Sequence, residues 1–310
     1  MGKGYVIITH AKNEERNLPL LAESMLKQTI KPAAWFVTDD GSDDRTPGII
    51  EELTSKFPWI DGRRLEKSQI SNTKELDTHF VKLTVNIFNH AVEFCNREGI
   101  EYGYIGKVDA DIVLPPDYFE RVIKNFEQNP ALGIAGGNYI FAELNERGEI
   151  TLRKTPRVIL EDGPSGGCIL IKKECFQEMG GIPPTTGAQD AAILAKARLC
   201  GWETKRFSNI EILHLRKRGS ARWDGYIAYR VDLHPLLVLL NFLVSLFRRE
   251  TFRGLAYVYS YSVALLKREP KVTDDSLRYY FRHKRLEEVK KLVSFKLNTK
   301  LKNLRLRKRY

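Results

Sequence analysis

Two short acidic clusters hold the residues best suited to chemistry. The first is in "WFVTDDGSDDRT" (residues 35–46), where four aspartates surround a glycine and a serine. The second is in "YIGKVDADIVLP", where Asp109 and Asp111 are two residues apart. Crowded carboxylates repel one another, but two that converge at the end of a strand can hold one hard cation together with phosphate oxygens. The clusters therefore predict a divalent cation that also contacts a phosphorylated substrate, and this cation would offset the repulsion.

Apolar segments precede both clusters and predict buried strands. They are "YVIIT" (residues 5–9), "WFVT" (35–38) and "YGYIGKV" (102–108), which are continuous runs rather than alternating ones. In an open parallel sheet, ligands bind outside the carboxyl ends of the strands. Because the two acidic clusters follow such strands directly, we expect them to lie at one edge of the sheet.

Helical patterns alternate with these strands. Apolar residues recur at helical spacing after Asn17, a candidate N-cap, and Thr46-Pro47 is typical of another helix start. Further predicted elements are a helix from the low 80s to about Arg97, a helix after Pro115-Pro116, a strand in "GGCILIKK" and a helix from about Asp190 to Cys200. This alternation predicts an α/β fold with a Rossmann-like, mostly parallel sheet flanked by helices.

Each acidic cluster alone is weakly specific. Asp-Asp-Gly-Ser also occurs in ordinary turns, where the aspartate caps the next helix and the glycine adopts a positive φ. Neither cluster has the ligand spacing of an EF-hand, so that class of calcium site is excluded.

Taken together, four motifs make the chain recognisable. They are "THAKNEERNLPLLAESMLKQT" (residues 9–29), "VTDDGSDDRT" (37–46), "KVDADIVLP" (107–115) and "QDAAILAKARLCGWET" (189–204). In this order they resemble the family 2 glycosyltransferases of the GT-A fold, and the resemblance covers about residues 4–220. It implies a GT-A nucleotide-diphospho-sugar transferase domain.

The resemblance also implies a donor site. The residues expected to bind the nucleotide-sugar are Thr9, Glu14, Asp39, Asp40, Lys82 and Asp109. Among them, Asp40 is expected to accept a hydrogen bond from the donor's base, and Asp109 to lie near the ribose or a metal ion. Lys82 resembles a donor-side lysine, although the glycine usual beside it in the family is missing here.

The same resemblance implies residues that bind the metal ion, a catalytic base and a loop that contacts the acceptor. Asp111, with Asp109 and His214, is expected to bind Mg²⁺ or Mn²⁺ at the donor's diphosphate. Asp190 matches the catalytic base, in a motif that usually reads Glu-Asp and here reads Gln-Asp. Gly166 and Gly167 lie where the family's acceptor loop sits.

The implied activity is an inverting sugar transfer from a UDP- or GDP-linked donor to an acceptor hydroxyl, for example on a polysaccharide or a lipid-linked glycan. Two other interpretations stay open at this point. A haloacid-dehalogenase-type phosphatase would use Asp109 as a nucleophile. A non-catalytic membrane- or nucleic-acid-binding protein would act through the basic C-terminal segment, although nucleic acid is disfavoured because few aromatic residues accompany the cations.

The C-terminal third differs in composition from the rest of the chain. Residues 1–220 are expected to form the catalytic domain and residues 221–310 an apolar, then basic, helical extension. The extension contains "PLLVLLNFLVSLF" and "GLAYVYSYSVALL", each 13 residues long and too short to be a confident membrane span. Their cationic flanks favour contact with a membrane surface, and a homodimer interface is the alternative. The four cysteines have no metal-ligand spacing, which favours free thiols in a reducing compartment. Together with the apolar and basic extension, this predicts a protein at the cytoplasmic face of a membrane.

Overall fold

The structure is a computed structural model of the 310-residue chain. It describes residues 4–66, 73–145, 148–152, 163–185, 188–215 and 220–294. The chain divides into two compact units: unit 1 comprises Met1–Arg157 and Asp162–Arg218, and unit 2 comprises Val158–Glu161 and Gly219–Tyr310. Each unit is described by itself.

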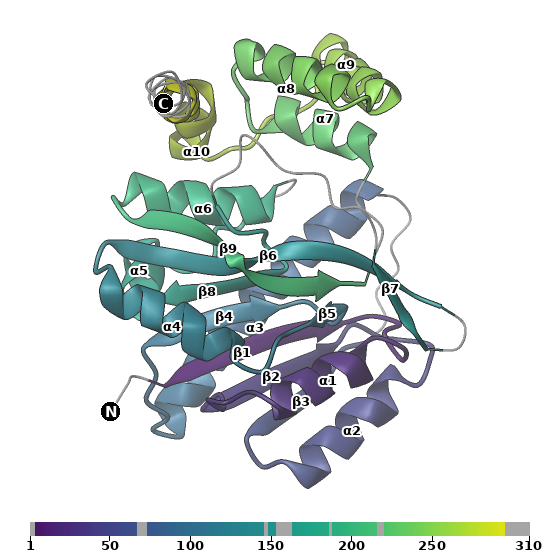
Figure 1. The fold of residues 1–310 in the computed structure, drawn as a ribbon, viewed down its shortest axis with the longest axis vertical. Coiled ribbons are helices and arrows are strands. Elements are labelled where there is room, and N and C mark those ends of the chain that lie inside the picture. Colours follow the sequence, from purple (N-terminus) through teal and green to yellow (C-terminus); the bar gives the residue numbers. More distant parts are fainter. Residues whose placement is uncertain are drawn as a thin grey trace, which may run out of the picture. The chain divides into compact units, whose positions relative to one another are not determined.

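Unit 1 is built from alternating strands and helices (Figure 1). The strands are β1 (Tyr5–Ala11), β2 (Ala34–Asp39), β3 (Ile60–Arg64), β4 (Tyr104–Val108), β5 (Ile112–Val113), β6 (Leu132–Leu144), β7 (Ile150–Leu152), β8 (Cys168–Lys172) and β9 (Glu203–His214). The helices are α1 (Leu18–Leu26), α2 (Thr46–Lys56), α3 (Thr73–Arg97), α4 (Tyr118–Gln128), α5 (Lys173–Glu178) and α6 (Gln189–Leu199).

The strands form one sheet in the order β3-β2-β1-β4-β8-β6-β9-β5, with β7 paired to β6. The α/β class is therefore confirmed. The sheet is mixed rather than mostly parallel, however, because β8 runs antiparallel to both β4 and β6. The first half, β1 to β4, is parallel and carries both acidic clusters at the carboxyl ends of its strands.

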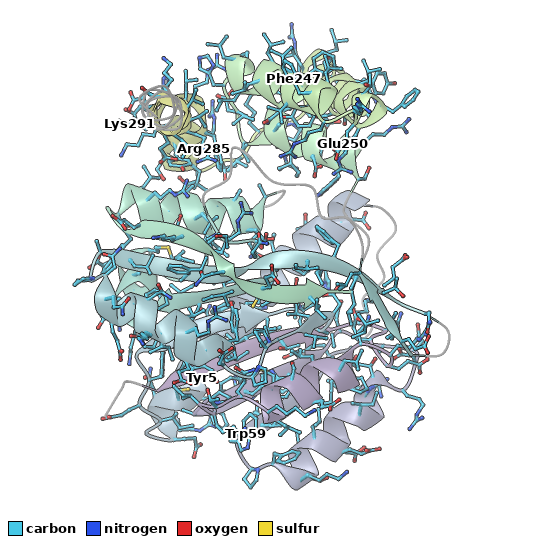
Figure 2. All side chains as sticks on the ribbon, viewed as in Figure 1. Tyr5, Trp59, Phe247, Glu250, Arg285 and Lys291 are labelled. Carbon is cyan, nitrogen blue, oxygen red and sulfur yellow. The ribbon has the colours of Figure 1, made fainter. Side chains whose placement is uncertain are left out.

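Helices cover both faces of the sheet. On β1 the side chains alternate, so that Tyr5 and Ile7 pack in one core cluster with α1, α2 and α4. Val6 and Ile8 pack in the second cluster, with α3, α5 and α6. Tyr5, at the start of β1, is labelled in Figure 2. Burial on both faces explains why these strands are continuous apolar runs.

Several predicted elements agree with the structure in kind but differ in extent. Helix α3 begins at Thr73, well before the low 80s. Helix α2 already includes Thr46 as its first residue, and Arg45 is its N-cap. The long strands β6 and β9 were not predicted. Their sequences, "LGIAGGNYIFAEL" and "ETKRFSNIEILH", contain glycines and polar residues that hide the strand pattern.

Unit 2 is helical. Its described helices are α7 (Ala221–Arg230), α8 (Pro235–Phe247), α9 (Thr251–Leu266), α10 (Asp275–Tyr279) and the π-helix η1 (Tyr280–Lys284). Close packing joins three of them: a Cβ on Gly225 of α7 would overlap the backbone of Tyr257 on α9, and a Cβ on Gly254 would lie 2.8 Å from Ser245 Cβ on α8. Among the described residues, no helix is both long and apolar enough to cross a membrane.

Candidate functional site

The carboxyl ends of β1, β2 and β4 bring the two acidic clusters to one edge of the sheet. Ala11 on β1 pairs with Asp39 on β2, and the Asp40 N–H donates to the Ala11 carbonyl at 2.8 Å. Strand β4 lies on the other side of β1 and ends at Val108, directly before Asp109. The expected common edge is therefore formed by neighbouring parallel strands.

In the first cluster, other groups of the protein compensate the charges. Asp40 is buried, with Oδ1 2.7 Å from His79 Nε2 on α3 and Oδ2 3.1 Å from Lys12 Nζ. The buried Asp39 carboxylate accepts from the Ser42 N–H and lies 3.4 Å from Arg64 Nε. Side chains and a backbone amide therefore offset part of the crowding of these two aspartates, and the expected contribution of a bound cation and donor stays a prediction.

Asp44 has a different role in the same turn. Its carboxylate accepts hydrogen bonds from the backbone N–H groups of Thr46, at the start of α2, and Glu15. Burial alone would raise the pKa of Asp44, but these hydrogen bonds outweigh it and hold the pKa below its ordinary value. Asp44 thus belongs to the helix-start geometry that is usual for this kind of turn.

The second cluster is organised around a buried lysine. Lys107 on β4 is 3% exposed, and its Nζ lies 3.2 Å from Asp109 Oδ1 and 3.8 Å from Asp190 Oδ1. Burial would lower the pKa of Lys107, but Asp109, Asp190 and Asp111 outweigh it and raise the pKa. Burial raises the pKa of Asp109 to about 6, although Lys107 opposes the shift. One ammonium group therefore joins the end of β4 to the start of α6.

Gly166 and Gly167 approach these carboxylates closely. A Cβ on Gly166 would overlap the side chain of Asp190. A Cβ on Gly167 would collide with Asp109 Oδ2 and lie 2.6 Å from the Tyr139 hydroxyl, and the Asp109 N–H donates to the Gly167 carbonyl at 2.7 Å. These two positions require glycine because carboxylates occupy the space that a side chain would fill.

Asp111 and His214 form a third pair. Asp111 is buried, and its Oδ2 lies 3.3 Å from His214 Nε2. The pairing of β5 with β9 sets this distance, because Ile112 is the register partner of His214 and the Leu215 N–H donates to the Asp111 carbonyl at 2.9 Å. The His214 ring stacks on Tyr139, with centroids 5.0 Å apart.

The donor atoms of this pair fit a divalent cation that also binds substrate. No described group of three or more His, Cys, Asp and Glu residues is arranged to hold a metal ion. Cations in phosphate-binding sites often take only one or two protein carboxylates, with substrate phosphates and water filling the other positions. Asp111 and His214 offer a carboxylate and an imidazole nitrogen at one point. Arg216, Lys217 and Arg218 follow His214 closely in the sequence and could neutralise phosphate charge, but they lie outside the described residues.

Three predicted donor residues have other surroundings. Thr9 is fully buried: its hydroxyl donates to the Val108 carbonyl and accepts from Trp35 Nε1, so it stabilises the sheet. The Glu14 carboxylate, also buried, accepts from Asn17 Nδ2 at the start of α1. Lys82 is exposed on α3 and forms no hydrogen bond or ion pair with another described residue. The donor roles expected of Thr9, Glu14 and Lys82 stay predictions.

Lys107, His79 and Lys12 are the site residues that sequence reasoning missed. Lys107 had a usable signal, since a lysine within the apolar strand "YIGKV" requires a carboxylate partner once it is buried. His79 had none, because its contact with Asp40 joins residues 39 positions apart.

Lys107 gives a stability prediction. Replacing it with methionine should lower the free energy of unfolding by about 2 kcal/mol, because Asp109 and Asp190 lose their shared cation, and both are partly open to water. Urea denaturation measures the change. Lys82→Met is the matched control and should alter stability by about 0.5 kcal/mol or less. Equal losses in the two variants would contradict the role assigned to Lys107.

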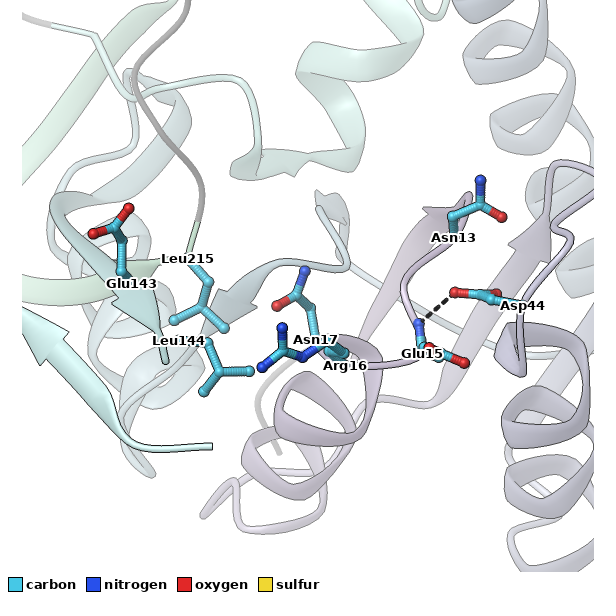
Figure 3. A pocket seen from close by; sticks show the side chains of 8 residues that line it. All are labelled: Asn13, Glu15, Arg16, Asn17, Asp44, Glu143, Leu144 and Leu215. Carbon is cyan, nitrogen blue, oxygen red and sulfur yellow. Dashed lines mark hydrogen bonds between the residues drawn. The ribbon is translucent and has the colours of Figure 1, made fainter. Parts of the chain in front are cut away.

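A separate pocket of about 390 Å³ lies beside these clusters (Figure 3). Its lining residues are Asn13, Glu15, Arg16, Asn17, Asp44, Glu143, Leu144 and Leu215. The lining contains Leu215, the neighbour of His214, but not Asp40, Asp109 or Asp190. The dashed line in Figure 3 is the hydrogen bond from the Glu15 N–H to Asp44. The pocket therefore includes Asp44 of the first cluster and the neighbour of His214, but none of the carboxylates assigned to the donor or to the general base.

Comparison with known proteins identifies relatives of this architecture. Residues 6–75 match the family model described as glycosyl transferase family 2. The structure of S. aureus TarS 1-349 in complex with UDP is similar at a TM-score of 0.51 and 16% identity, covering 73% of this chain and 63% of that chain. This chain thus spans less than two thirds of the length of that TarS structure.

A second solved structure covers more of both chains. It is the mannosyltransferase PcManGT from Pyrobaculum calidifontis in complex with GDP-Man and Mn²⁺, with a TM-score of 0.51 and 15% identity. The similarity covers 86% of this chain and 74% of that chain. At these identities the likeness concerns the fold, and it confirms the predicted GT-A class.

Proposed function

We propose that this chain, which matches the glycosyl transferase family 2 model over residues 6–75 and has a GT-A fold, transfers a sugar from a nucleoside diphosphate to an acceptor hydroxyl. The observation that carries the proposal is the contact of one buried ammonium, Lys107, with Asp109 and Asp190. The Lys107 ammonium holds Asp109, which is suited to the donor, and Asp190, which is suited to the acceptor, at one edge of the sheet. The acceptor is a hydroxyl of a glycan or of a lipid-linked glycan.

The donor binds at the ends of β2 and β4 in this proposal. Asp40 contacts the base and Asp109 the ribose, and His79 and Lys12 hold the Asp40 carboxylate in position. The two similar solved structures support a nucleotide ligand, since one contains UDP and the other GDP-Man. The donor of this chain is therefore a UDP- or GDP-linked sugar.

A divalent cation, Mg²⁺ or Mn²⁺, would be held by Asp111 and His214, with Asp109 nearby. When bound it would supply Lewis-acid stabilisation of the negative charge that develops on the departing diphosphate. Mn²⁺ in the similar P. calidifontis structure supports this assignment. The chain itself contributes the orientation of Asp111, because the pairing of β5 with β9 keeps its carboxylate against His214.

Asp190 is the general base in this proposal. It lies in the first turn of α6, and its side chain is 52% exposed, which lets an acceptor hydroxyl approach. The positive end of the helix dipole and the Lys107 ammonium both stabilise its negative charge. Beside it, the buried Gln189 anchors the helix by donating from Nε2 to the Val81 carbonyl of α3 at 3.4 Å.

The reaction is then a single displacement. Asp190 takes the proton of the acceptor hydroxyl while the hydroxyl oxygen attacks the anomeric carbon and the bond to the nucleoside diphosphate breaks. Attack from the face opposite the leaving group inverts the anomeric configuration. General-base assistance of this kind is typically worth about 10²–10⁴-fold in rate.

Nucleotide binding tests the donor site. Isothermal titration calorimetry of the full chain with UDP and with GDP should give binding of one nucleotide in Mn²⁺ that is lost in a chelator. Asp111→Asn should weaken this binding by at least about tenfold, because the cation loses a charged ligand.

Asp117→Asn is the matched control for this experiment. It removes one carboxylate near the start of α4, where Asp117 pairs only loosely with Arg121 at 3.8 Å, and it should leave the affinity unchanged. A folded wild-type chain that binds neither nucleotide would contradict the proposed donor site.

A further inference from the structure

Helices α8 and α9 of unit 2 each carry an exposed apolar stripe. On α8 the exposed residues recur at intervals of three and four: Leu236, Leu239, Leu243, Leu246 and Phe247. On α9 the stripe consists of Phe252, Leu255, Tyr259 and Leu266. Phe247, labelled in Figure 2, and Phe252 flank the turn between the helices and are 88% and 90% exposed. Apolar stripes of this size on a folded surface mark an interaction site.

The stripes lie on the outside of a well-packed hairpin. Asn241 on α8 donates to the Tyr257 hydroxyl on α9, and Gly254 packs on Ser245. Tyr229 of α7 meets Tyr261 of α9 edge to face, with ring centroids 5.9 Å apart. Burial raises the pKa of Tyr257 to about 12. Because these contacts use the inner sides of the helices, the exposed stripes are not needed to hold the hairpin together.

Cations lie at the C-terminal ends of both helices. Arg248 and Arg249 follow α8 at the turn, and Lys267 and Arg268 follow α9 at its other end. In the sequence from 220 to 310 there are 21 Lys and Arg against 8 Asp and Glu, whereas residues 1–219 have 29 against 31. Unit 2 therefore combines apolar stripes with a strongly positive charge.

We propose that the α8–α9 hairpin docks on the surface of a lipid bilayer that contains anionic lipids. The helices lie in the interface, with Phe247 and Phe252 inserted among the acyl chains and the arginines and lysines against the headgroups. A helix of 13 residues extends about 20 Å, shorter than the roughly 30 Å hydrocarbon core, which favours an in-plane position over a spanning one.

Charge favours a bilayer over a second copy of this chain as the partner of the hairpin. A symmetric dimer through the hairpin would bring the same cations of two subunits together, at a cost in repulsion. An anionic bilayer offers the apolar phase that the stripes need and the charge that the cations need. This inference does not depend on the proposed transferase activity.

Vesicle co-sedimentation of the full chain tests the proposal. The protein should pellet with vesicles of phosphatidylcholine and phosphatidylglycerol, less with phosphatidylcholine alone, and less at high salt. Phe247→Ser with Phe252→Ser should weaken binding by about tenfold or more, because two inserted rings are removed. Arg249→Glu with Lys267→Glu should weaken binding to the anionic vesicles in particular.

Ile150→Ser with Leu152→Ser is the matched control, since both residues are exposed apolar side chains on β7 of unit 1. Its vesicle binding should equal that of the wild type. Binding that survives the double phenylalanine change would overturn the hairpin assignment. A wild type that does not bind vesicles would also overturn the proposal. Sedimentation velocity would then identify a dimer interface at the hairpin if the wild type is dimeric and the phenylalanine variant is monomeric.

Discussion

Asp190→Asn is expected to lower kcat by about 10²–10⁴-fold while donor binding stays close to that of the wild type. Asparagine has nearly the same shape as aspartate but cannot accept the proton of the attacking hydroxyl. Asp190 is half exposed at the start of α6; it shares the Lys107 ammonium with Asp109 but is not itself proposed to bind the donor. Steady-state kinetics with the cognate sugar, and calorimetry with the nucleotide alone, measure the two quantities separately.

Glu98→Gln is the control for this experiment. Glu98 is 48% exposed, close to the 52% of Asp190, and it also pairs with a cation, Arg97, but it lies just after the end of α3. Its kcat should equal that of the wild type. If the Asp190→Asn variant keeps the wild-type kcat, Asp190 is not the general base. If donor affinity fell as much as kcat, Asp190 would belong to the donor site instead.

Gly166→Ala is expected to lower kcat by about 10²-fold. A methyl group at this position would overlap the Asp190 side chain, so either the carboxylate or the loop must move. A displacement of about 1 Å in a reacting group can cost a factor of this size. Because the atoms nearest to the added methyl group all belong to Asp190, nucleotide affinity should change little.

A double-mutant cycle separates this effect from general loss of stability. Gly166→Ala in the Asp190→Asn background should cost little further activity, since both changes act through the same carboxylate. Gly48→Ala is the control, because a Cβ at Gly48 of α2 meets no atom within 4 Å. Fully additive losses in kcat would show that Gly166 acts independently of Asp190.

The positions of both acidic clusters could be predicted from the chain. Continuous apolar runs predict strands buried on both faces, and the carboxyl ends of adjacent parallel strands meet at one edge. The "DDGS" turn and the "DAD" segment therefore lie together, as expected, after β2 and β4. The family match over residues 6–75 also favours the transferase interpretation over the phosphatase one.

The partners of these carboxylates could not be predicted in the same way. His79 reaches Asp40 from a helix that begins earlier than its apolar pattern indicated. The antiparallel strand β8 and its preceding loop bring Gly166 and Gly167 against Asp190 and Asp109. These contacts join residues that are tens of positions apart, and no local spacing encodes them.

The sequence by itself determined the class of the fold, the strands β1, β2 and β4 of its parallel half and the edge at which the acidic residues gather. These features follow from short-range patterns: hydrophobic periodicity, turn residues and charge. Only the tertiary structure decided that Lys107 joins Asp109 to Asp190, that Thr9 stabilises the sheet, and that α8 and α9 leave apolar stripes exposed. Those outcomes depend on which surfaces pack together, because burial and ion pairing are settled by distant parts of the chain.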